Sequence, residues 1–366
     1  MRKLWTVLIT LVILSLTMST IACGGGGEQP NGGGTTTPLP TGTTQTEVTP
    51  RPTTTPRPTP MLRDNPLPGT ATASVLNWDV RVLESKRGDA AWQDIKAANR
   101  NNEAAPQGME YLLVKLHVKC NYSDDKEHLV TLRDFAVTGD RLVEYSRAPV
   151  VPPEPLLYAR LTSGQTTEGW AAYLVGQGEG NLMLVVSELL NPLAGGRWYI
   201  ALDEGASITV APELSDIAPT DIGKQSGSPA ALNQAVTTED WQVTLLEVQR
   251  GDAAWGMVQQ ASQDNTPPQS GMEYIATKVR VRSISTVDQP TIIDAGYFSA
   301  LGSDDKTYES PSVELPEPAL YAVLFPGGQY EGWVVLQVPQ GKSVVLVFAP
   351  PDDETGVNKR YLSLGS

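Results

Sequence analysis

Four glutamates that could perform acid–base chemistry each occur twice in this chain of 366 residues, 163 positions apart. The pairs are Glu84 with Glu247, Glu110 with Glu273, Glu154 with Glu317, and Glu168 with Glu331. Two carboxyl groups held about 5–10 Å apart can hydrolyse a glycosidic bond. No phosphate-binding glycine loop, nucleophile elbow or cluster with metal-ligand spacing accompanies these glutamates. We therefore expect surface salt bridges or caps at these positions, and no catalytic residue, metal ion or cofactor.

The spacing of the glutamates belongs to a repeat that covers most of the chain. Arg-Gly-Asp-Ala-Ala-Trp begins at 87 and again at 250, and Gly-Met-Glu-Tyr begins at 108 and again at 271. From Trp78 to Trp170, 34 of 93 positions match their counterparts without a gap. This unit is far longer than the 20–50 residues of a solenoid repeat. We predict two copies of one domain, residues 70–212 and 230–366, joined by a polar linker at 213–229.

Six tryptophans occupy three equivalent positions in the two copies. They are most simply core anchors, since large aromatic side chains bury much surface. An exposed tryptophan would instead offer a flat stacking platform for a sugar ring. The six candidate binding residues are Trp78, Trp92, Trp170, Trp241, Trp255 and Trp333.

The triplet Arg-Gly-Asp, known from integrin-mediated adhesion, occurs at 87–89 and 250–252. An adhesion motif needs an exposed hairpin tip, whereas both triplets lead directly into Ala-Ala-Trp. Aspartate is a good N-cap and glycine a good turn residue, so the start of a helix explains the triplet. We predict that Asp89 and Asp252 cap two short helices, the first of which carries on one face Trp92, Ile95 and Ala98.

Most other segments alternate between apolar and polar residues, which is typical of strands with one buried side. The longest example has an apolar face of Leu112, Val114, Leu116 and Val118. Further strands are predicted, each with a counterpart in the second copy, at Trp78–Glu84, Thr131–Thr138, Gly169–Val175, Leu182–Val186 and Arg197–Leu202. About seven short strands and one helix per copy predict an all-β protein made of two tandem β-sandwiches.

The N-terminus is typical of an exported protein. Arg2 and Lys3 precede an apolar run that is too short to span a bilayer comfortably, so we interpret residues 1–22 as a signal peptide. The end of the run, Ser19-Thr20-Ile21-Ala22-Cys23, resembles the lipobox of bacterial lipoproteins, which implies lipidation of Cys23. Between Thr35 and Pro60, 19 of 26 residues are Thr or Pro. We predict a disordered tether at 23–68.

Charge and cysteine content exclude several classes of protein. Lys and Arg number 27 against 41 Asp and Glu, and the net charge of −14 argues against a nucleic-acid partner. Two cysteines cannot build a disulfide scaffold, and Cys120, which corresponds to Ser283, is expected to be a half-buried structural thiol. His117 and His128 have no histidine counterparts, so we expect no shared site there, and we expect His117, on the polar face of its strand, to be solvated.

Each copy resembles the telokin-like, immunoglobulin-like domain of unknown function found in many bacterial surface lipoproteins. The resemblance rests on Gly108–Tyr111 and Gly271–Tyr274 before a long strand, and on the segment from Phe298 to the turn and Tyr308. Val338-Pro339-Gln340-Gly341 also fits, whereas the first copy lacks this proline. The resemblance implies two immunoglobulin-like β-sandwiches and a surface location, and it brings no catalytic residues.

The sequence therefore indicates a non-enzymatic cell-surface protein, located outside the cytoplasm and anchored to the membrane through its N-terminal lipid. We expect a binding or envelope-scaffold role with a polysaccharide or protein partner. Two alternatives stay open. One is a carbohydrate-binding module that uses exposed tryptophans, and the other is a weak hydrolase of envelope polymers that uses the duplicated glutamates.

Overall fold

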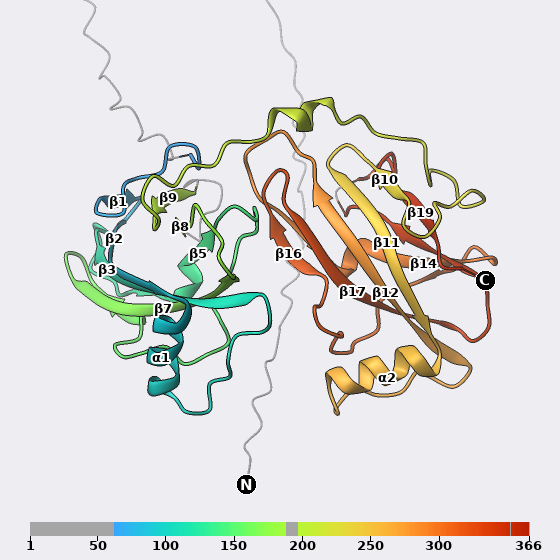
Figure 1. Ribbon diagram of the computed structural model, residues 1–366, viewed down its shortest axis with the longest axis horizontal. Coiled ribbons are helices and arrows are strands. Elements are labelled where there is room, and N and C mark those ends of the chain that lie inside the picture. The colour runs from blue at the N-terminus through green and yellow to red at the C-terminus, as the bar shows by residue number, and fades with distance from the viewer. Residues whose placement is uncertain (1–61, 188–196, 352, 366) are drawn as a thin grey trace, which may run out of the picture. The chain divides into compact units, whose positions relative to one another are not determined.

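The computed structural model describes residues 62–187, 197–351 and 353–365, and in both copies these residues form β-sandwiches (Figure 1). The predicted signal peptide, Cys23 and all of the predicted tether before residue 62 lie outside the described residues. Below, the first copy means strands β1–β9 and the second copy strands β10–β19.

The first copy contains two sheets and a two-stranded ribbon, all with antiparallel pairing. The larger sheet has the order β1 (Thr72–Val75), β2 (Trp78–Arg87), β3 (Met109–Cys120) and β7 (Thr166–Gly176). The second sheet has the order β5 (Phe135–Thr138), β8 (Met183–Val186) and β9 (Trp198–Ala201). The ribbon pairs β4 (His128–Val130) with β6 (Ala159–Leu161).

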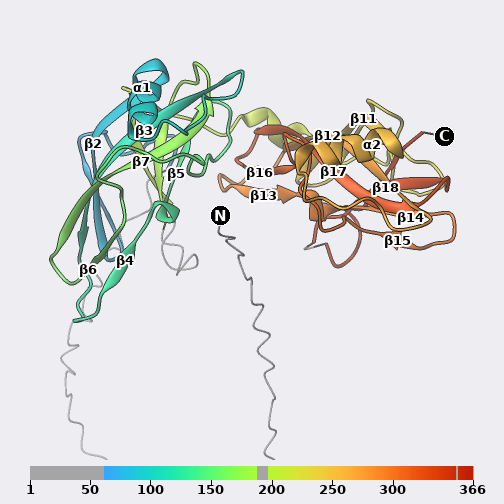
Figure 2. The ribbon, with the colours of Figure 1, turned by 90° about the horizontal axis from the view of Figure 1, so that it is seen from below.

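The second copy repeats this arrangement with one additional short strand. Its larger sheet has the order β10 (Ala235–Thr237), β11 (Trp241–Arg250), β12 (Met272–Ser283) and β17 (Gln329–Pro339). Its second sheet has the order β15 (Thr307–Tyr308), β14 (Phe298–Gly302), β18 (Val344–Phe348) and β19 (Arg360–Ser363). Its ribbon pairs β13 (Thr291–Asp294) with β16 (Tyr321–Leu324), and Figure 2 shows the ribbons of both copies.

Each copy has its own hydrophobic core between its two sheets. In the first copy, the predicted apolar face of β3 packs against residues of the other sheet such as Val137 and Leu184. In the second copy, Val279 and Val281 of β12 pack with Leu346 and Phe348 of β18. Because successive strand residues point to opposite faces, the alternation read from the sequence places these residues in the interior.

One helix in each copy covers the outer face of the larger sheet, α1 (Gly88–Ala98) and α2 (Asp252–Ala261). The predicted N-caps are wrong: Arg87 and Gly251 occupy the cap positions, and both aspartates lie in the first turn, where they favour the helix dipole. Ala98 is exposed, although we predicted it on the apolar face of the helix. Within the described ranges, no helix is long and apolar enough to cross a membrane.

The strand predicted at Thr131–Thr138 is only half correct. Its first part forms a short 3-10 helix, Leu132–Asp134, because Thr131 and Asp134 cap each other's backbone N–H groups. Similar turns span Ala295–Tyr297 in the second copy and Pro212–Asp216 between the copies.

Two segments predicted as tether and linker are packed where the structure describes them. Leu67 exchanges backbone hydrogen bonds with the strand β9, and the Arg63 side chain is fully buried. In the linker, Leu214 is buried, and Arg360 of β19 donates to the carbonyl of Thr220. These packed residues are apolar or form hydrogen bonds with residues far along the chain, as Arg63 does with Asp288, and the composition of the two segments concealed this packing.

The copies also contact each other within the unit formed by residues 58–366. Phe325 of the second copy joins a cluster that includes Met183 and Tyr199 of the first copy. The backbone N–H of Glu144 donates to the carbonyl oxygen of Val323 over 2.8 Å. Each copy therefore keeps its own core, and this smaller cluster is shared.

Candidate functional site

None of the six candidate tryptophans is exposed. Trp170, Trp241 and Trp333 are buried, and the other three are partly buried. Trp92 stacks on Tyr111 with ring centroids 5.8 Å apart, and Trp255 packs on Tyr274 in the equivalent place. All six pack against core clusters and hold the helices and sheets together, so they do not offer the free faces that a sugar platform needs.

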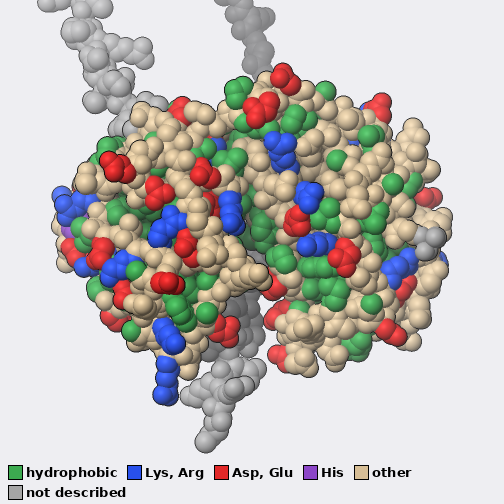
Figure 3. All heavy atoms as spheres, viewed as in Figure 1, with side chains coloured by type: hydrophobic (Ala, Val, Ile, Leu, Met, Phe, Trp, Pro, Cys, Tyr) green, Lys and Arg blue, Asp and Glu red, His purple; other side chains and the backbone are tan. Residues whose placement is uncertain are grey.

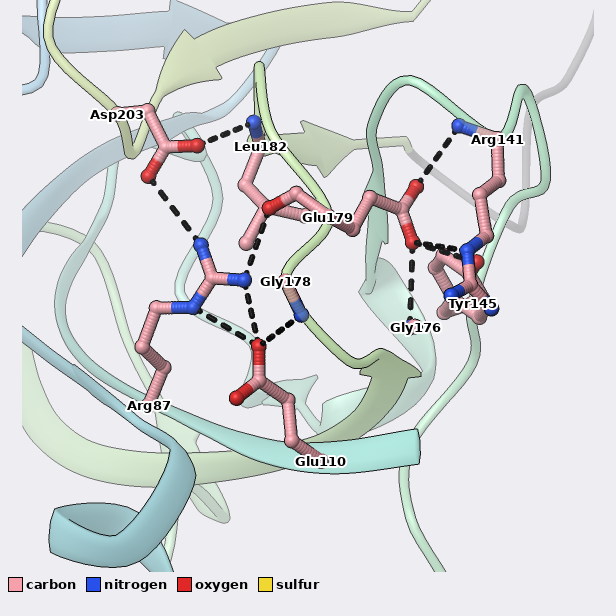
Figure 4. A network of polar contacts seen from close by, with 9 residues as sticks. All are labelled: Arg87, Glu110, Arg141, Tyr145, Gly176, Gly178, Glu179, Leu182 and Asp203. Atoms are coloured by element: carbon pink, nitrogen blue, oxygen red, sulfur yellow. Dashed lines mark hydrogen bonds and ion pairs between the residues drawn. The ribbon is translucent and has the colours of Figure 1, made fainter. Parts of the chain in front are cut away.

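The arginine of the Arg-Gly-Asp triplet pairs with the glutamate of the Gly-Met-Glu-Tyr motif (Figure 4). In the first copy, Nη2 of Arg87 lies 2.5 Å from Oε1 of Glu110 and donates to the carbonyl of Glu179 over 2.8 Å. The N–H of Gly178 donates to the same carboxylate oxygen. We call this contact of Arg87 with Glu110 and the carbonyl of Glu179 the clasp. It connects the start of α1 to β3 and to the turn between β7 and β8.

The second copy contains the same clasp. Nη2 of Arg250 lies 2.8 Å from Oε1 of Glu273 and 2.9 Å from the carbonyl oxygen of Lys342. The N–H of Gly341 donates to the same carboxylate oxygen over 3.0 Å. Two identical motifs, 21 residues apart in each copy, are therefore explained by a single structural contact.

Glu179 lies beside the clasp, and its side chain is completely buried. Its Oε2 accepts from the hydroxyl of Tyr145 over 2.7 Å and from the N–H of Gly176 over 3.1 Å. Its Oε1 accepts from the N–H of Arg141, whose Nε lies 3.9 Å from Oε2. Burial, followed by the charge of Glu179, raises the pKa of Tyr145 far above its ordinary value. This carboxylate is fully used in holding the turn, which leaves it no free oxygen for chemistry.

The ion pair next to the clasp is reversed in polarity between the copies. Arg141 and Glu179 correspond to Asp304 and Lys342, 163 positions later in each case. Nζ of Lys342 lies 3.0 Å from Oδ2 of Asp304. The contact is thus retained while both charges are exchanged.

The other repeated glutamates also have partners inside their own copy. Oε2 of Glu154 accepts from the N–H two residues ahead, as does Oε2 of Glu317. Glu168 pairs with Lys115, and Glu331 pairs with a lysine and an arginine on β12. Figure 3 shows acidic and basic side chains mixed over the face in view.

The glutamates on β3 and β7 are too far apart for paired-carboxylate hydrolysis. Glu110 lies opposite Val175, which is seven residues along β7 from Glu168. Seven strand residues span about 23 Å, compared with the 5–10 Å that hydrolysis requires. Among the described residues, no group of three or more His, Cys, Asp or Glu side chains is placed to hold a metal ion.

The histidines and the cysteine are likewise placed for structural roles. His128 lies 2.6 Å from Asp124 and stacks on Tyr122, while His117 lies partly buried on the outer face of β3. His128 is therefore paired, and His117 is less exposed than the solvated side chain we expected. Cys120 is a free, fully buried thiol, more buried than predicted.

Exposed apolar residues recur at only two positions of the repeat. Of the large hydrophobic side chains exposed in the described ranges, only Leu129 with Ile292 and Tyr158 with Tyr321 lie 163 positions apart. Their exposed fractions are 42% and 49% for the aliphatic pair and 58% and 60% for the tyrosines. We call the outward surface of each ribbon that carries these residues the ribbon face.

The strand register places both residues of each copy on the same ribbon face. In the second copy, Ile292 lies opposite Val323 and Asp294 lies opposite Tyr321, while Ile293 between them is buried. In the first copy, Leu129 lies opposite Arg160, and Tyr158 is two residues before Arg160 and so shares its face. Each ribbon face is therefore an open surface on which an aliphatic side chain and a tyrosine are exposed together.

A loop fixed to the neighbouring sheet presents each tyrosine. In the first copy, the loop crosses Gly169 so closely that a Cβ there would lie 2.4 Å from the backbone nitrogen of Leu157. The N–H of Trp170 donates to the carbonyl of Pro155, and Leu157 is fully buried, which turns the next residue, Tyr158, outward.

The second copy builds the same support with Gly332, Leu320 and Pro318. A Cβ on Gly332 would lie 2.6 Å from Cα of Leu320, and the N–H of Trp333 donates to the carbonyl of Pro318. Each loop contains one cis peptide bond, between Glu154 and Pro155 in the first copy and between Glu317 and Pro318 in the second. Pro-Glu-Pro occurs at 153–155 and 316–318, and Glu-Gly-Trp at 168–170 and 331–333. These repeated motifs therefore form the two parts of one support.

Sequence reasoning missed the ribbon faces. The identity of Tyr158 and Tyr321 was visible in the repeat, but tyrosine is found both inside and outside proteins, so its type does not predict exposure. The strands of the first ribbon have three residues each, too few to show an alternation.

Three solved structures are similar to parts of the chain at low identity. The yjhA protein from Bacillus subtilis is 15% identical, with 37% of this chain and 99% of that chain covered at a TM-score of 0.27. An uncharacterised β-sandwich protein from Clostridium difficile 630 is 13% identical, with 37% and 91% covered at a TM-score of 0.24. A candidate lipoprotein from Bacillus subtilis, ycdA, is 10% identical, with 58% and 72% covered at a TM-score of 0.28.

TM-scores this low assign neither a fold nor a function to this chain. No protein-family model matches the sequence, and no curated protein matches it. The β-sandwich architecture therefore rests on the strand pairing and the cores described above.

Proposed function

We propose that this protein is a non-enzymatic, lipid-anchored surface protein that displays two β-sandwich copies outside the cytoplasm and binds envelope components. One observation carries the proposal: the repeated polar residues that could do chemistry are used within the fold. Glu110 and Glu273 each hold an arginine and a backbone N–H. Glu84 pairs with Lys86, Glu247 accepts from the side-chain amide of Gln249, and the other four repeated glutamates have the local partners given above.

The anchor is supported by the order of features at the N-terminus. Arg2 and Lys3, a short apolar run and Cys23 stand in the order of a lipoprotein signal. Stable anchoring takes more than one acyl chain, and a diacylglyceryl cysteine with an N-acyl group supplies three.

The two alternatives find less support in the geometry. A hydrolase needs two carboxyl groups that face a common ligand, and Glu110 and Glu168 are about 23 Å apart along the sheet. A carbohydrate-binding module based on tryptophan needs exposed indole rings, and the six candidates pack against core clusters.

Cell fractionation of the full chain in a bacterial host tests the anchor. We expect the wild-type protein in the membrane fraction, released only by detergent, and the Cys23→Ser variant in the soluble or secreted fraction. The matched control is Cys120→Ser, because the chain has only these two cysteines and the second copy has serine at the position equivalent to 120. The control should stay with the membrane. Membrane-bound Cys23→Ser protein would contradict the proposal.

A further inference from the structure

The ribbon faces are exceptional because they keep exposed apolar residues in both copies. Surface substitutions usually change stability by less than about 0.5 kcal/mol, so exposed positions are free to diverge. Other exposed apolar residues have done so: Val151 corresponds to Glu314, and Val287 corresponds to Asp124. Single exposed apolar residues need no explanation, but a pair kept on the same face of both copies does.

Neither tyrosine is needed for the interior of its copy. The residue before each tyrosine, Leu157 or Leu320, fills the core, and the loop is fixed by backbone hydrogen bonds to β7 or β17. The loop and the glycine beneath it therefore fix the backbone of Tyr158 and Tyr321 before any partner binds. Such preorganisation lowers the entropy cost of binding.

The surroundings of the tyrosines favour a small, flat ligand unit with polar edges. Next to Tyr158 the ribbon face carries Leu129 and Arg160, and next to Tyr321 it carries Ile292 and Asp294. An aromatic ring attracts C–H groups to its electron-rich face. A pyranose ring presents such C–H groups on one side and hydroxyl groups around its edge, where an arginine or a carboxylate can form hydrogen bonds.

A stable protein partner fits these faces less well. Specific protein interfaces bury about 1,200–2,000 Å² in total, usually around several buried anchors. Each ribbon face has one exposed aromatic and one exposed aliphatic side chain, on or next to strands of three or four residues. Two equivalent small faces in tandem suit a polymer of repeating units, since a second contact to the same polymer raises the overall affinity.

We infer that each ribbon face is a polysaccharide-binding surface, with Tyr158 and Tyr321 as stacking platforms for sugar rings. This inference rests on the proposed surface location and deepens it by naming the ligand class. It assigns the stacking role to two tyrosines in place of the tryptophans expected from the sequence.

Co-sedimentation of the full chain in detergent with two insoluble glycans, peptidoglycan sacculi and chitin, tests the inference. We expect the wild-type protein to bind at least one of them. Tyr158→Ala or Tyr321→Ala should each weaken binding about 3- to 10-fold, and the double variant about 10- to 100-fold. The Tyr158→Phe and Tyr321→Phe double variant keeps both rings and should bind within about 2-fold of the wild type.

The matched control is the Val151→Ala and Val287→Ala double variant, which alters one exposed apolar residue of each copy outside the ribbon faces. It should bind like the wild type. Absence of wild-type binding to both glycans, or unchanged binding of the double tyrosine-to-alanine variant, would overturn the inference. So would a tyrosine-dependent interaction with a purified envelope protein but with neither glycan. None of these outcomes touches the proposed anchor, which is read separately from the fractionation of Cys23→Ser.

Discussion

Glu179→Ala is expected to destabilise the first copy strongly, whereas Lys342→Ala at the equivalent position should have little effect on the second copy. The Glu179 carboxylate accepts from the hydroxyl of Tyr145 and from the N–H groups of Gly176 and Arg141, and its side chain is completely buried. Removing it leaves three donors without their acceptor, each costing about 1–3 kcal/mol. The Arg141 side chain is 46% exposed and stays solvated, so the cost comes from the orphaned donors and amounts to about 3–5 kcal/mol in total.

The Lys342 side chain is 46% exposed and that of Asp304 is 31% exposed. Exposed ion pairs contribute little because water already solvates both charges. The two variants alter equivalent positions of the two copies. The difference between their losses of stability therefore reflects how deeply each side chain is buried, and not its position in the fold.

Urea denaturation with native-state hydrogen exchange measures both effects, since exchange reports on β8 of the first copy and β18 of the second copy separately. We expect Glu179→Ala to lower the free energy of unfolding of the first copy by about 3–5 kcal/mol, because three donors lose their acceptor. Equal effects of the two variants, or a loss below about 1 kcal/mol for Glu179→Ala, would refute the assignment of Glu179 as a buried structural carboxylate.

Three further variants test the packing and the charges. Gly169→Ala should destabilise the first copy by about 1–3 kcal/mol in urea unfolding, because its Cβ would meet Leu157, whereas Gly227→Ala, which meets nothing, should be neutral. Gly256→Ala inside α2 should stabilise the protein by about 0.5–1 kcal/mol in thermal unfolding, and a loss would contradict the open space there. The hydrogen bond from Arg280 lowers the pKa of Glu331 below 4.5, so the pair stabilises the fold above that pH and the effect is lost as the pH falls through the folded-state pKa. Glu331→Gln should therefore cost about 0.5 kcal/mol at pH 7 and progressively less as the pH falls below 4.5, and a loss that does not change with pH would refute this.

Much of the fold could be predicted because the repeat and the strand alternation report on the interior. Leu112 and its alternate neighbours on β3 are buried as the period of two requires. The helix starts were misplaced by one or two residues, because Arg87 is held by Glu110, a contact between segments far apart in sequence.

The candidate site could not be predicted from residue types. We considered the tryptophans as stacking platforms for sugars, but a large ring stabilises the fold more when it is buried, as Trp170 and Trp333 are. The exposure of Tyr158 depends on a loop that crosses Gly169, and the sequence does not reveal that approach. The reversed polarity of Arg141 and its counterpart Asp304 likewise has meaning only once their partners are known.

Hydrogen–deuterium exchange of the full chain with soluble oligomers of the glycan that it binds in co-sedimentation, peptidoglycan or chitin, tests most directly whether two equivalent copies present two equivalent binding faces. We expect the oligomers to slow exchange in both ribbons, at 128–130 and 159–161 in the first copy and at 291–294 and 321–324 in the second. Exchange in α1 and α2 should be unchanged. Slower exchange in one copy alone, or at the helices and not at the ribbons, would contradict this account.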